Sequence, residues 1–483
     1  MVKIDGPVGV GDGGAGKGAI VLGPPGPDLS SVGYTEAEYF VSGEASSYTS
    51  DAPLTSDGRW WVRRDATAPF TTRIVVRRPV DPARFNGTVH VEWLNVSGGL
   101  DASPDWTYVH VGLMRAGAMW VGVSAQVVGI DGHHADDPGS FMALKVADPE
   151  RYGPLDHPGD DFSYDIFRQV GALVRDRSDV LLGGLEPERV LAVGESQSAF
   201  RLSTYVDAVA PMARAYDGYL LHSRATGGAP LSLGRRVNGL SSDQLPPAKV
   251  PAPDPTLVRG DLDVPVLVVS AETDLVGEHL AYVRARQPDT RWFRSWEVAG
   301  TAHGDAYQLG IGDADDGSGA ADRALFAALS DPPSSIYFGV ITCEAPINAG
   351  PQTYVLRAAF EALDQWVRSG EPPPSMPRLE VDAAGTDFVR DGAGNARGGI
   401  RTPHVDVPIA TLSGLGQSGE SFCSLFGTTM PLGSEELADR YPDHSSFVAR
   451  WHAATDAAVA AGAILPADAE HLKQAAADSD VGR

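Results

Sequence analysis

Runs of apolar residues, many of them β-branched, recur along the chain and alternate with stretches whose apolar positions repeat at helical spacing. The runs predict buried strands at residues 73–78, 88–96, 118–124, 190–193, 219–222, 264–270 and 292–298. The helical spacing predicts helices at residues 106–116, 164–175, 200–206 and 354–368. Continuous apolar strands that alternate with amphipathic helices are typical of a mainly parallel sheet covered by helices on both faces. We therefore predict an α/β fold.

The remaining sequence divides around this core. Residues 1–60 are rich in Gly, Pro and Ser, which predicts a β-rich N-terminal decoration. The core is predicted over residues 61–370. Lid insertions are predicted near residues 125–160 and 224–262, where polar, Pro- and Gly-containing stretches interrupt the alternation. A run of prolines follows the last core helix, and residues 371–483 are predicted to form a C-terminal extension.

Charge and hydropathy restrict the partners. The formal net charge of −25 argues against a nucleic-acid or anionic-membrane partner, because both bind cationic surfaces. No apolar run approaches the ~20 residues of a transmembrane helix, so we predict no membrane span. Because no signal peptide is visible at the start, we expect a cytoplasmic protein. Secretion is the alternative if a leader has been removed.

Cysteine is scarce in this sequence. Cys343 and Cys423 are its two cysteines, which excludes a disulfide scaffold or a zinc site made of several thiolates. They could form one bridge that closes a loop of about 80 residues and stabilises the fold by a few kcal/mol through chain entropy. The sequence does not give the distance between their Cα atoms, so the pairing stays open.

The clearest chemical signal is the turn at residues 194–198. The strand at residues 190–193 runs into Gly-Glu-Ser-Gln-Ser, and a helical pattern follows at once. A Gly-x-Ser-x-small sequence between a strand and a helix is the pattern of a nucleophile elbow, which lifts the serine hydroxyl above the carboxyl end of a parallel sheet. The sequence therefore predicts Ser196 as a nucleophile.

A serine hydroxyl needs a base, and the base needs an acid that orients it. In hydrolases with this elbow, the acid and then the histidine follow the serine along the chain. Asp274 follows one predicted strand and His303 follows the next, so both fall at carboxyl ends of strands, where such sheets place their active sites. We predict His303 as the base and Asp274 as its acid. Glu272, two residues away, is the alternative acid.

An oxyanion hole requires two preorganised N–H donors. We predict the amide of Gln197 as one donor. The other is predicted in the Gly-rich turn after the strand at residues 88–96, as the amide of Val96 or of Ser97. The predicted chemistry uses no cofactor and no metal ion.

These motifs resemble the α/β-hydrolase superfamily. More narrowly, the chain resembles a poorly characterised bacterial family of "alpha/beta hydrolase domain" proteins. The matching stretches are the elbow at 194–198, the strand at 91–95, the acid loop at 271–274, and further segments at 151–155, 160–165, 398–403 and 408–411. Ser198 departs from the glycine that is usual in the superfamily. The resemblance covers nearly the whole chain, so it implies an α/β-hydrolase fold with residues 371–483 packed on the core.

The acid loop is also similar to that of hormone-sensitive-lipase-like esterases, in which the aspartate is the triad member, and this resemblance implies Asp274. We predict a serine carboxylester hydrolase that acts through an acyl-enzyme on a small or medium-sized ester. No feature for holding a peptide is visible, which favours an ester over an amide. The alternatives are an acyltransferase or amidase on the same triad, or a non-catalytic, hydrolase-like binding protein.

Overall fold

The computed structural model describes residues 2–11, 14, 16–24, 26–132, 141–234, 247–277, 280–336, 339, 341–420 and 422–483. Nine strands form its central sheet: β1 (Lys3–Asp5), β2 (Tyr34–Thr49), β3 (Arg63–Pro79), β4 (Thr88–Trp93), β5 (Met119–Val123), β6 (Arg189–Glu195), β7 (Gly218–His222), β8 (Val266–Ser270) and β9 (Phe293–Glu297). Their order is β1-β2-β3-β5-β4-β6-β7-β8-β9.

The six strands from β5 to β9 in this order run parallel, and β1, β2 and β3 add antiparallel pairs at one edge. Every residue of β4, β5, β6, β7 and β8 is buried, which explains why apolar residues dominate these strands. The predicted α/β class and the mainly parallel sheet are confirmed.

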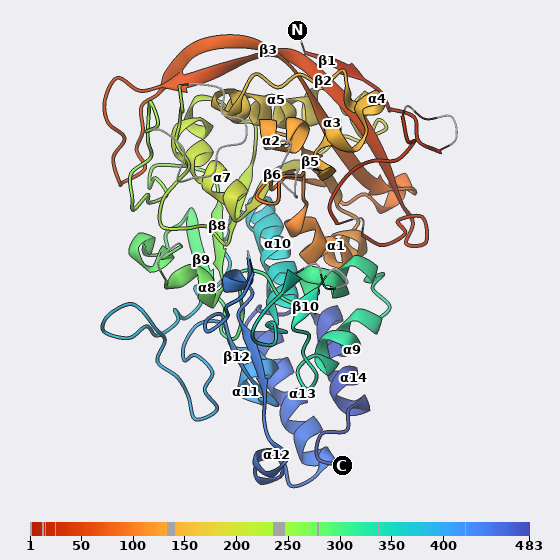
Figure 1. Ribbon diagram of the computed structural model, residues 1–483, viewed down its shortest axis with the longest axis vertical. Helices are drawn as coiled ribbons and strands as arrows, with labels where there is room; N and C mark the ends of the chain where they lie inside the picture. The colour runs from red at the N-terminus through yellow and green to blue at the C-terminus, as the bar shows by residue number, and fades with distance from the viewer. Residues whose placement is uncertain are drawn as a thin grey trace.

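Helices cover both faces of the sheet (Figure 1). On one face lie α5 (Ser163–Asp176) and α7 (Gln197–Ala208), whose side chains meet where Phe167 packs edge-on against Tyr205. On the other face lie α1 (Pro104–Ala116) and α10 (Gln352–Ser369), which contact each other beneath β6. Because helices cover both faces of the sheet, a site can form at the edge where the carboxyl ends of the parallel strands meet and polar loops follow them.

The N-terminal region continues the sheet of the predicted core. Strand β2 pairs with β3 from Tyr34 opposite Pro79 to Thr49 opposite Arg63. The predicted boundary near residue 60 falls within this hairpin. The long antiparallel pairing therefore joins residues 34–49 to the core through backbone hydrogen bonds.

The two predicted lid insertions differ in their regular structure. The first carries the short helices α2 (Val127–Asp131), α3 (Leu144–Ala147) and α4 (Pro149–Tyr152). The described residues of the second, 224–234 and 247–262, contain only an isolated bridge between Ser232 and Val250. Residues 133–140 and 235–246 of these insertions lie outside the described part of the chain.

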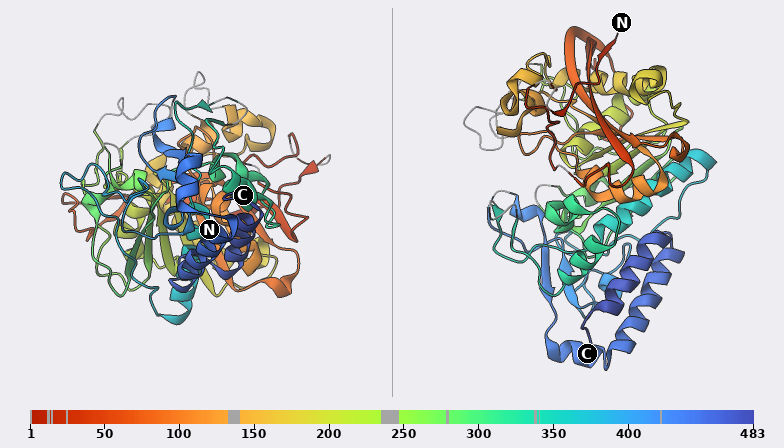
Figure 2. Two further views of the ribbon diagram at one scale, coloured as in Figure 1. Left: turned by 90° about the horizontal axis from the view of Figure 1, so that it is seen from below. Right: turned by 90° about the vertical axis from the view of Figure 1, so that its right-hand side faces the viewer.

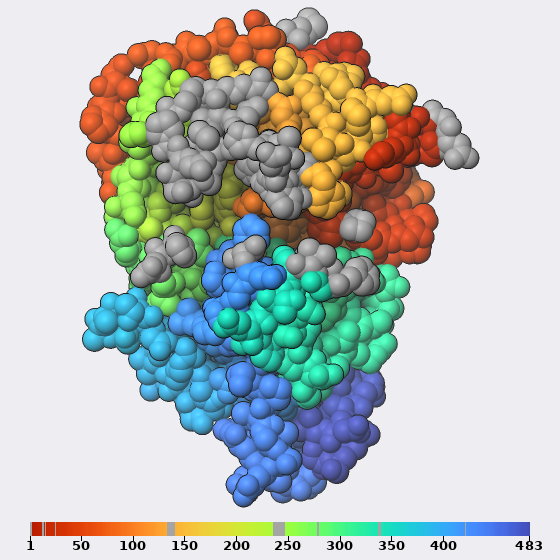
Figure 3. Space-filling model, viewed as in Figure 1, coloured from red at the N-terminus to blue at the C-terminus, as the bar shows by residue number. Residues whose placement is uncertain are grey.

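The C-terminal residues form a smaller body below the sheet (Figures 1 and 2). It contains the hairpin of β12 (Ala410–Ser413) and β13 (Thr428–Pro431) and the helices α11 (Pro403–Asp406), α12 (Ser434–Arg440), α13 (His444–Ala460) and α14 (Pro466–Asp478). Helix α14 packs on α13 and on α9 (Ala320–Ala327). The space-filling view shows this C-terminal body packed directly against the rest of the molecule (Figure 3).

Buried ion pairs tie this C-terminal body to the core. Asp468 on α14 lies 2.9 Å from Arg115 on α1 and 3.2 Å from Arg357 on α10. The side chains of Asp468 and Arg357 are both 0% exposed. A buried carboxylate stays charged only where cations and hydrogen bonds compensate for its lost hydration, so these contacts hold the helices in one arrangement.

The two cysteines, whose pairing the sequence left open, form a disulfide with a Cα–Cα distance of 5.5 Å. It joins Cys343, which follows the short strand β11 (Ile341–Thr342), to Cys423 in the C-terminal body. Among the described residues, no helix has the length and apolar character required to span a bilayer.

Candidate active site

The turn between β6 and α7 is as sharp as the elbow motif predicts. Ser196 has φ 55° and ψ −122°, a conformation that costs a residue with a side chain about 1–3 kcal/mol. A Cβ atom on Gly194 would lie 3.2 Å from the backbone of Ser198, so α7 starts directly above the end of β6. The Ser196 amide donates to the carbonyl oxygen of His222 on β7 (2.9 Å), which helps to hold the turn.

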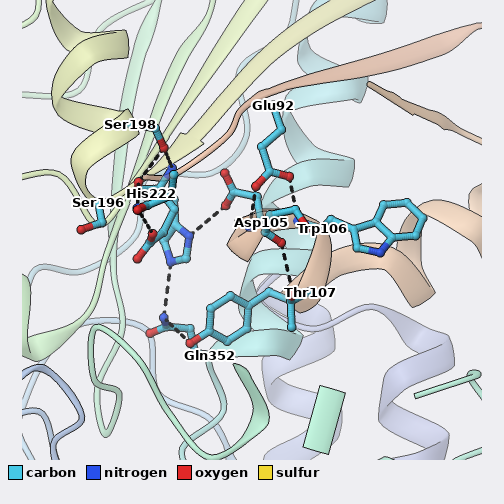
Figure 4. Close-up of polar contacts among 12 residues, drawn as sticks. Glu92, Asp105, Trp106, Thr107, Ser196, Ser198, His222 and Gln352 are labelled. Carbon is cyan, nitrogen blue, oxygen red and sulfur yellow. Dashed lines mark hydrogen bonds and ion pairs between the residues drawn. The ribbon is translucent and has the colours of Figure 1, made fainter. Parts of the chain in front are cut away.

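Ser198 closes the elbow with its side chain. Its buried hydroxyl donates to the carbonyl oxygen of Glu195 (2.7 Å) and accepts from the amide of the same residue (3.1 Å). These two bonds reach back across the turn, as the close-up shows (Figure 4). The serine therefore fits where the superfamily usually has glycine.

The structure brings Ser196, His303 and Asp274 together from three loops at the carboxyl edge of the sheet. His303 follows β9, and its Nε2 lies 2.8 Å from Ser196 Oγ. Asp274 lies on the one-turn helix α8 (Glu272–Leu275) after β8, and its Oδ1 lies 2.7 Å from His303 Nδ1. Its second oxygen accepts from the Ala271 amide (2.6 Å), which orients the carboxylate.

Glu272, the alternative acid, faces a different part of the molecule. Its Oε1 accepts from the amide of Gly300 (2.6 Å), and its Oε2 accepts from the amide of Gly414 (2.9 Å). Burial raises the pKa of Glu272 to about 7, although both backbone hydrogen bonds favour the carboxylate. The structure does not bring this carboxyl group to His303.

The electrostatic surroundings of His303 favour a charged imidazole. Its burial opposes that charge, but the Asp274 hydrogen bond and the carboxylates of Asp274 and Glu195 raise the pKa of His303 to about 8. Only 5% of the His303 surface is exposed, so these interactions act in a poorly hydrated place. A base in such surroundings accepts a proton readily.

The predicted oxyanion donors differ in their hydrogen bonding. The Ser97 amide donates to Asn95 Oδ1 (2.8 Å) and is therefore occupied within its own turn. For the Val96 amide the described residues provide no acceptor. Gln197 is the first residue of α7, so its amide has no partner within the helix.

Asn95 and Gln126 connect the loops around Ser196. Asn95 Nδ2 donates to the carbonyl oxygen of Glu195 (3.1 Å), which links the loop after β4 to the elbow. Gln126 Oε1 accepts from Gln197 Nε2 (2.9 Å). This bond connects the start of the first insertion to the residue that follows Ser196. Across the described part of the chain, no three metal-ligating side chains lie close enough together to hold an ion.

The sequence prediction missed a buried polar chain beneath the site (Figure 4). His222 Nδ1 lies 2.9 Å from Asp105 Oδ1 at the start of α1. The Glu92 carboxylate on β4 accepts the amides of Asp105 (3.1 Å) and Trp106 (2.9 Å). Burial raises the pKa of Asp105 to about 8 and lowers that of His222 to about 4. The sequence did contain one sign of this chain: Glu92 is a charged residue within a strand that is predicted to be buried.

The parallel sheet, the elbow and the order of Ser196, Asp274 and His303 define an α/β-hydrolase fold. The family described as "Alpha/beta hydrolase domain" matches residues 4–474, and the chain belongs to this family. No curated protein sequence matches the chain.

Several solved structures are similar in fold. An arylesterase is 13% identical with a TM-score of 0.25, over 42% of this chain and 63% of its own, which is less than two thirds of its length. A lipase/esterase from Lactobacillus plantarum is 12% identical with a TM-score of 0.26, over 48% of this chain and 78% of its own. An esterase from Rhizomucor miehei is 15% identical with a TM-score of 0.25, over 48% of this chain and 66% of its own. Similarity at this level carries no argument about the substrate.

Proposed function

We propose that the protein is a serine carboxylester hydrolase that cleaves a small or medium-sized ester through an acyl-enzyme. One observation carries the proposal: His303 Nε2 lies 2.8 Å from Ser196 Oγ while its Nδ1 lies 2.7 Å from Asp274 Oδ1. A serine hydroxyl in contact with an imidazole whose other nitrogen is held by a buried carboxylate is arranged for nucleophilic attack.

In the acylation step Ser196 Oγ attacks the ester carbonyl carbon and its proton passes to His303 Nε2. Asp274 keeps the Nδ1 proton in place and stabilises the imidazolium that forms. The amides of Gln197 and Val96 are the proposed donors to the oxyanion, each lowering the barrier by about 3 kcal/mol. Val96 is preferred over Ser97 because the Ser97 amide already donates to Asn95.

The bond to the leaving alkoxide then breaks, the alkoxide takes the proton from His303 Nε2, and the acyl group stays on Ser196, which completes acylation. In deacylation a water molecule gives one proton to His303 Nε2 while its oxygen attacks the acyl carbon. The bond from that carbon to Ser196 Oγ then breaks, Oγ takes the proton back from His303, and the acid is released. The insertions near residues 125–160 and 224–262 are the proposed lid. If an alcohol or an amine took the acyl group instead of water, the protein would be an acyltransferase.

A fluorophosphonate probe tests the proposal, because it reacts with activated serines. We expect one probe per wild-type chain, located at Ser196, and no labelling of Ser196→Ala. The matched control is Ser203→Ala, which removes a hydroxyl of the same helix that bonds to Ala199 (2.7 Å), outside the site. We expect this control to be labelled like wild type.

A panel of p-nitrophenyl esters, with and without added alcohols, then separates hydrolysis from acyl transfer. We expect the free acid as the main product. A folded wild-type protein that neither takes up the probe nor cleaves any ester would refute the proposal.

A further inference from the structure

A second carboxyl group reaches the nitrogen of His303 that Ser196 uses. Glu195 Oε1 lies 3.3 Å from His303 Nε2, and the two side chains are 4% and 7% exposed. The other Glu195 oxygen, Oε2, accepts from Asn95 Nδ2 (3.0 Å). Asn95 therefore holds one oxygen of this carboxyl group and leaves the other facing the Nε2 atom.

The titratable groups around this contact come from four elements. His303 is faced by Asp274 from α8 and by Glu195 from β6. Glu195 is faced in addition by His222 from β7 and by Asp105 from α1. Burial raises the pKa of Glu195 to about 7, so this acid takes up a proton close to neutral pH. His303 and Glu195 thus bind protons in overlapping pH ranges, with their proton-binding atoms in contact.

On the basis of the proposed function, we propose that Glu195 shares a proton with His303 at Nε2 and competes with Ser196 for that nitrogen. The shared proton has two positions, on Glu195 Oε1 or on His303 Nε2. In both positions it lies between the two atoms, so the Nε2 lone pair cannot accept the proton of Ser196. The serine is activated only after this proton has left to solvent.

The same carboxyl group also acts during the reaction. Once the shared proton has left, Glu195 is a carboxylate beside Nε2. When Ser196 transfers its proton to His303, the new imidazolium lies between the carboxylates of Asp274 and Glu195, which both stabilise its charge. Glu195 therefore sets the lower pH limit of the activity and contributes to the rate above that limit.

The test is the pH profile of Glu195→Gln. We measure the second-order rate of fluorophosphonate inactivation and kcat/KM for p-nitrophenyl acetate between about pH 5 and 10. For wild type we expect an acidic limb with its midpoint near pH 8, the pKa of His303. Glutamine carries no titrating proton but keeps an oxygen for Asn95, so we expect the limb to move about one pH unit lower and the plateau to fall.

Two further variants separate this role from a structural one. Glu195→Ala removes the proton and also the bond to Asn95, and we expect the same shift of the limb with a lower plateau. Glu272→Gln is the matched control, because Glu272 is also a buried carboxyl group with a pKa of about 7 but contacts the amides of Gly300 and Gly414 instead of His303. We expect its acidic limb to stay at the wild-type position.

The outcomes distinguish this inference from the proposed function. Failure of the probe to label Ser196 in wild type would overturn the proposed function itself. Labelling of wild type together with an unshifted acidic limb in both Glu195 variants would overturn the role of Glu195 and leave the proposed function intact. A shift of equal size in Glu272→Gln would also overturn it, because the effect would then be one of total buried charge.

Discussion

Asp274 and Glu272 lie two residues apart on the one-turn helix α8, yet their carboxyl groups bind different loops. Asp274 Oδ1 contacts His303 Nδ1 at 2.7 Å. Glu272 instead accepts the amide of Gly300, near His303, and that of Gly414, in the C-terminal body. One helical turn thus supplies the proposed acid of the site and anchors the loops that surround it.

This division of roles predicts different effects of two isosteric substitutions. Asp274→Asn replaces the acceptor of the Nδ1 proton by an amide, and we expect kcat to fall by about 10³–10⁴-fold. Glu272→Gln leaves His303 and its acid in place, and we expect a far smaller loss. Ester hydrolysis by the two purified variants measures the difference. Equal and small effects would contradict both assignments.

Glu272 also makes the stability of the protein depend on pH. The folded-state pKa of about 7 lies above the ordinary value of 4.5, so this group's stabilising contribution is complete below about pH 4.5 and is lost as the pH rises to 7. The loss is on the order of 3 kcal/mol. Urea unfolding should show that the stability of wild type relative to Glu272→Gln falls between pH 5 and pH 8.

The control for this measurement is Glu435→Gln on α12, where the side chain is exposed. Its stability relative to wild type should be the same at both pH values. A constant difference for Glu272→Gln as well would show that Glu272 has no raised pKa in the folded protein.

We expect the disulfide to stabilise the folded protein strongly, because it joins two residues that are 80 positions apart in the sequence. Replacing both cysteines by serine should lower the free energy of unfolding by about 4 kcal/mol through chain entropy. We also expect lower activity. The carbonyl oxygen of Leu425, two residues after Cys423, accepts a hydrogen bond from the amide of Gly304, the residue after His303 (3.1 Å). Urea unfolding and ester hydrolysis measure the two effects.

Thiol titration in denaturant checks the bridge directly. We expect no free thiols in protein recovered from an oxidising compartment, where disulfides form and persist. Two free thiols in such protein would contradict the pairing of Cys343 with Cys423.

The buried ion pairs predict that the C-terminal body is required for stability. Asp468→Ala removes one of the two buried carboxylates that Arg357 contacts and leaves Asp315 (2.9 Å) as the other, and we expect a loss of about 1.5–3 kcal/mol in the free energy of unfolding. Asp456→Ala on the neighbouring helix is the control, because Asp456 is 64% exposed in its pair with Lys473. We expect it to change the stability by less than about 1 kcal/mol. Similar losses of stability in both variants would show that the ion pairs of Asp468 do not stabilise the packing of α14 on the core.

Much of the fold could be predicted because burial on both faces of a parallel sheet produces unbroken apolar strands. The predicted strands at residues 190–193 and 264–270 fall in or overlap β6 and β8. The contact between Ser196 and His303 could be anticipated for a related reason: the carboxyl ends of parallel strands meet at one edge, so residues that follow different strands come together. Glu195, Asn95 and His222 could not be assigned in this way, since their roles depend on which side chains meet across that edge.

The sequence by itself determined the class of fold, the elbow at Ser196 and the candidates for its partners, because local patterns decide which segments become strands, turns and helices. The tertiary structure alone decided which carboxyl group of α8 reaches His303, which amide after β4 stays unoccupied, and that Cys343 pairs with Cys423. These choices are made by contacts between segments far apart in the chain, such as Glu272 with Gly414, 142 residues away. Such contacts follow from the packing of whole elements, which leaves no signal in the local sequence.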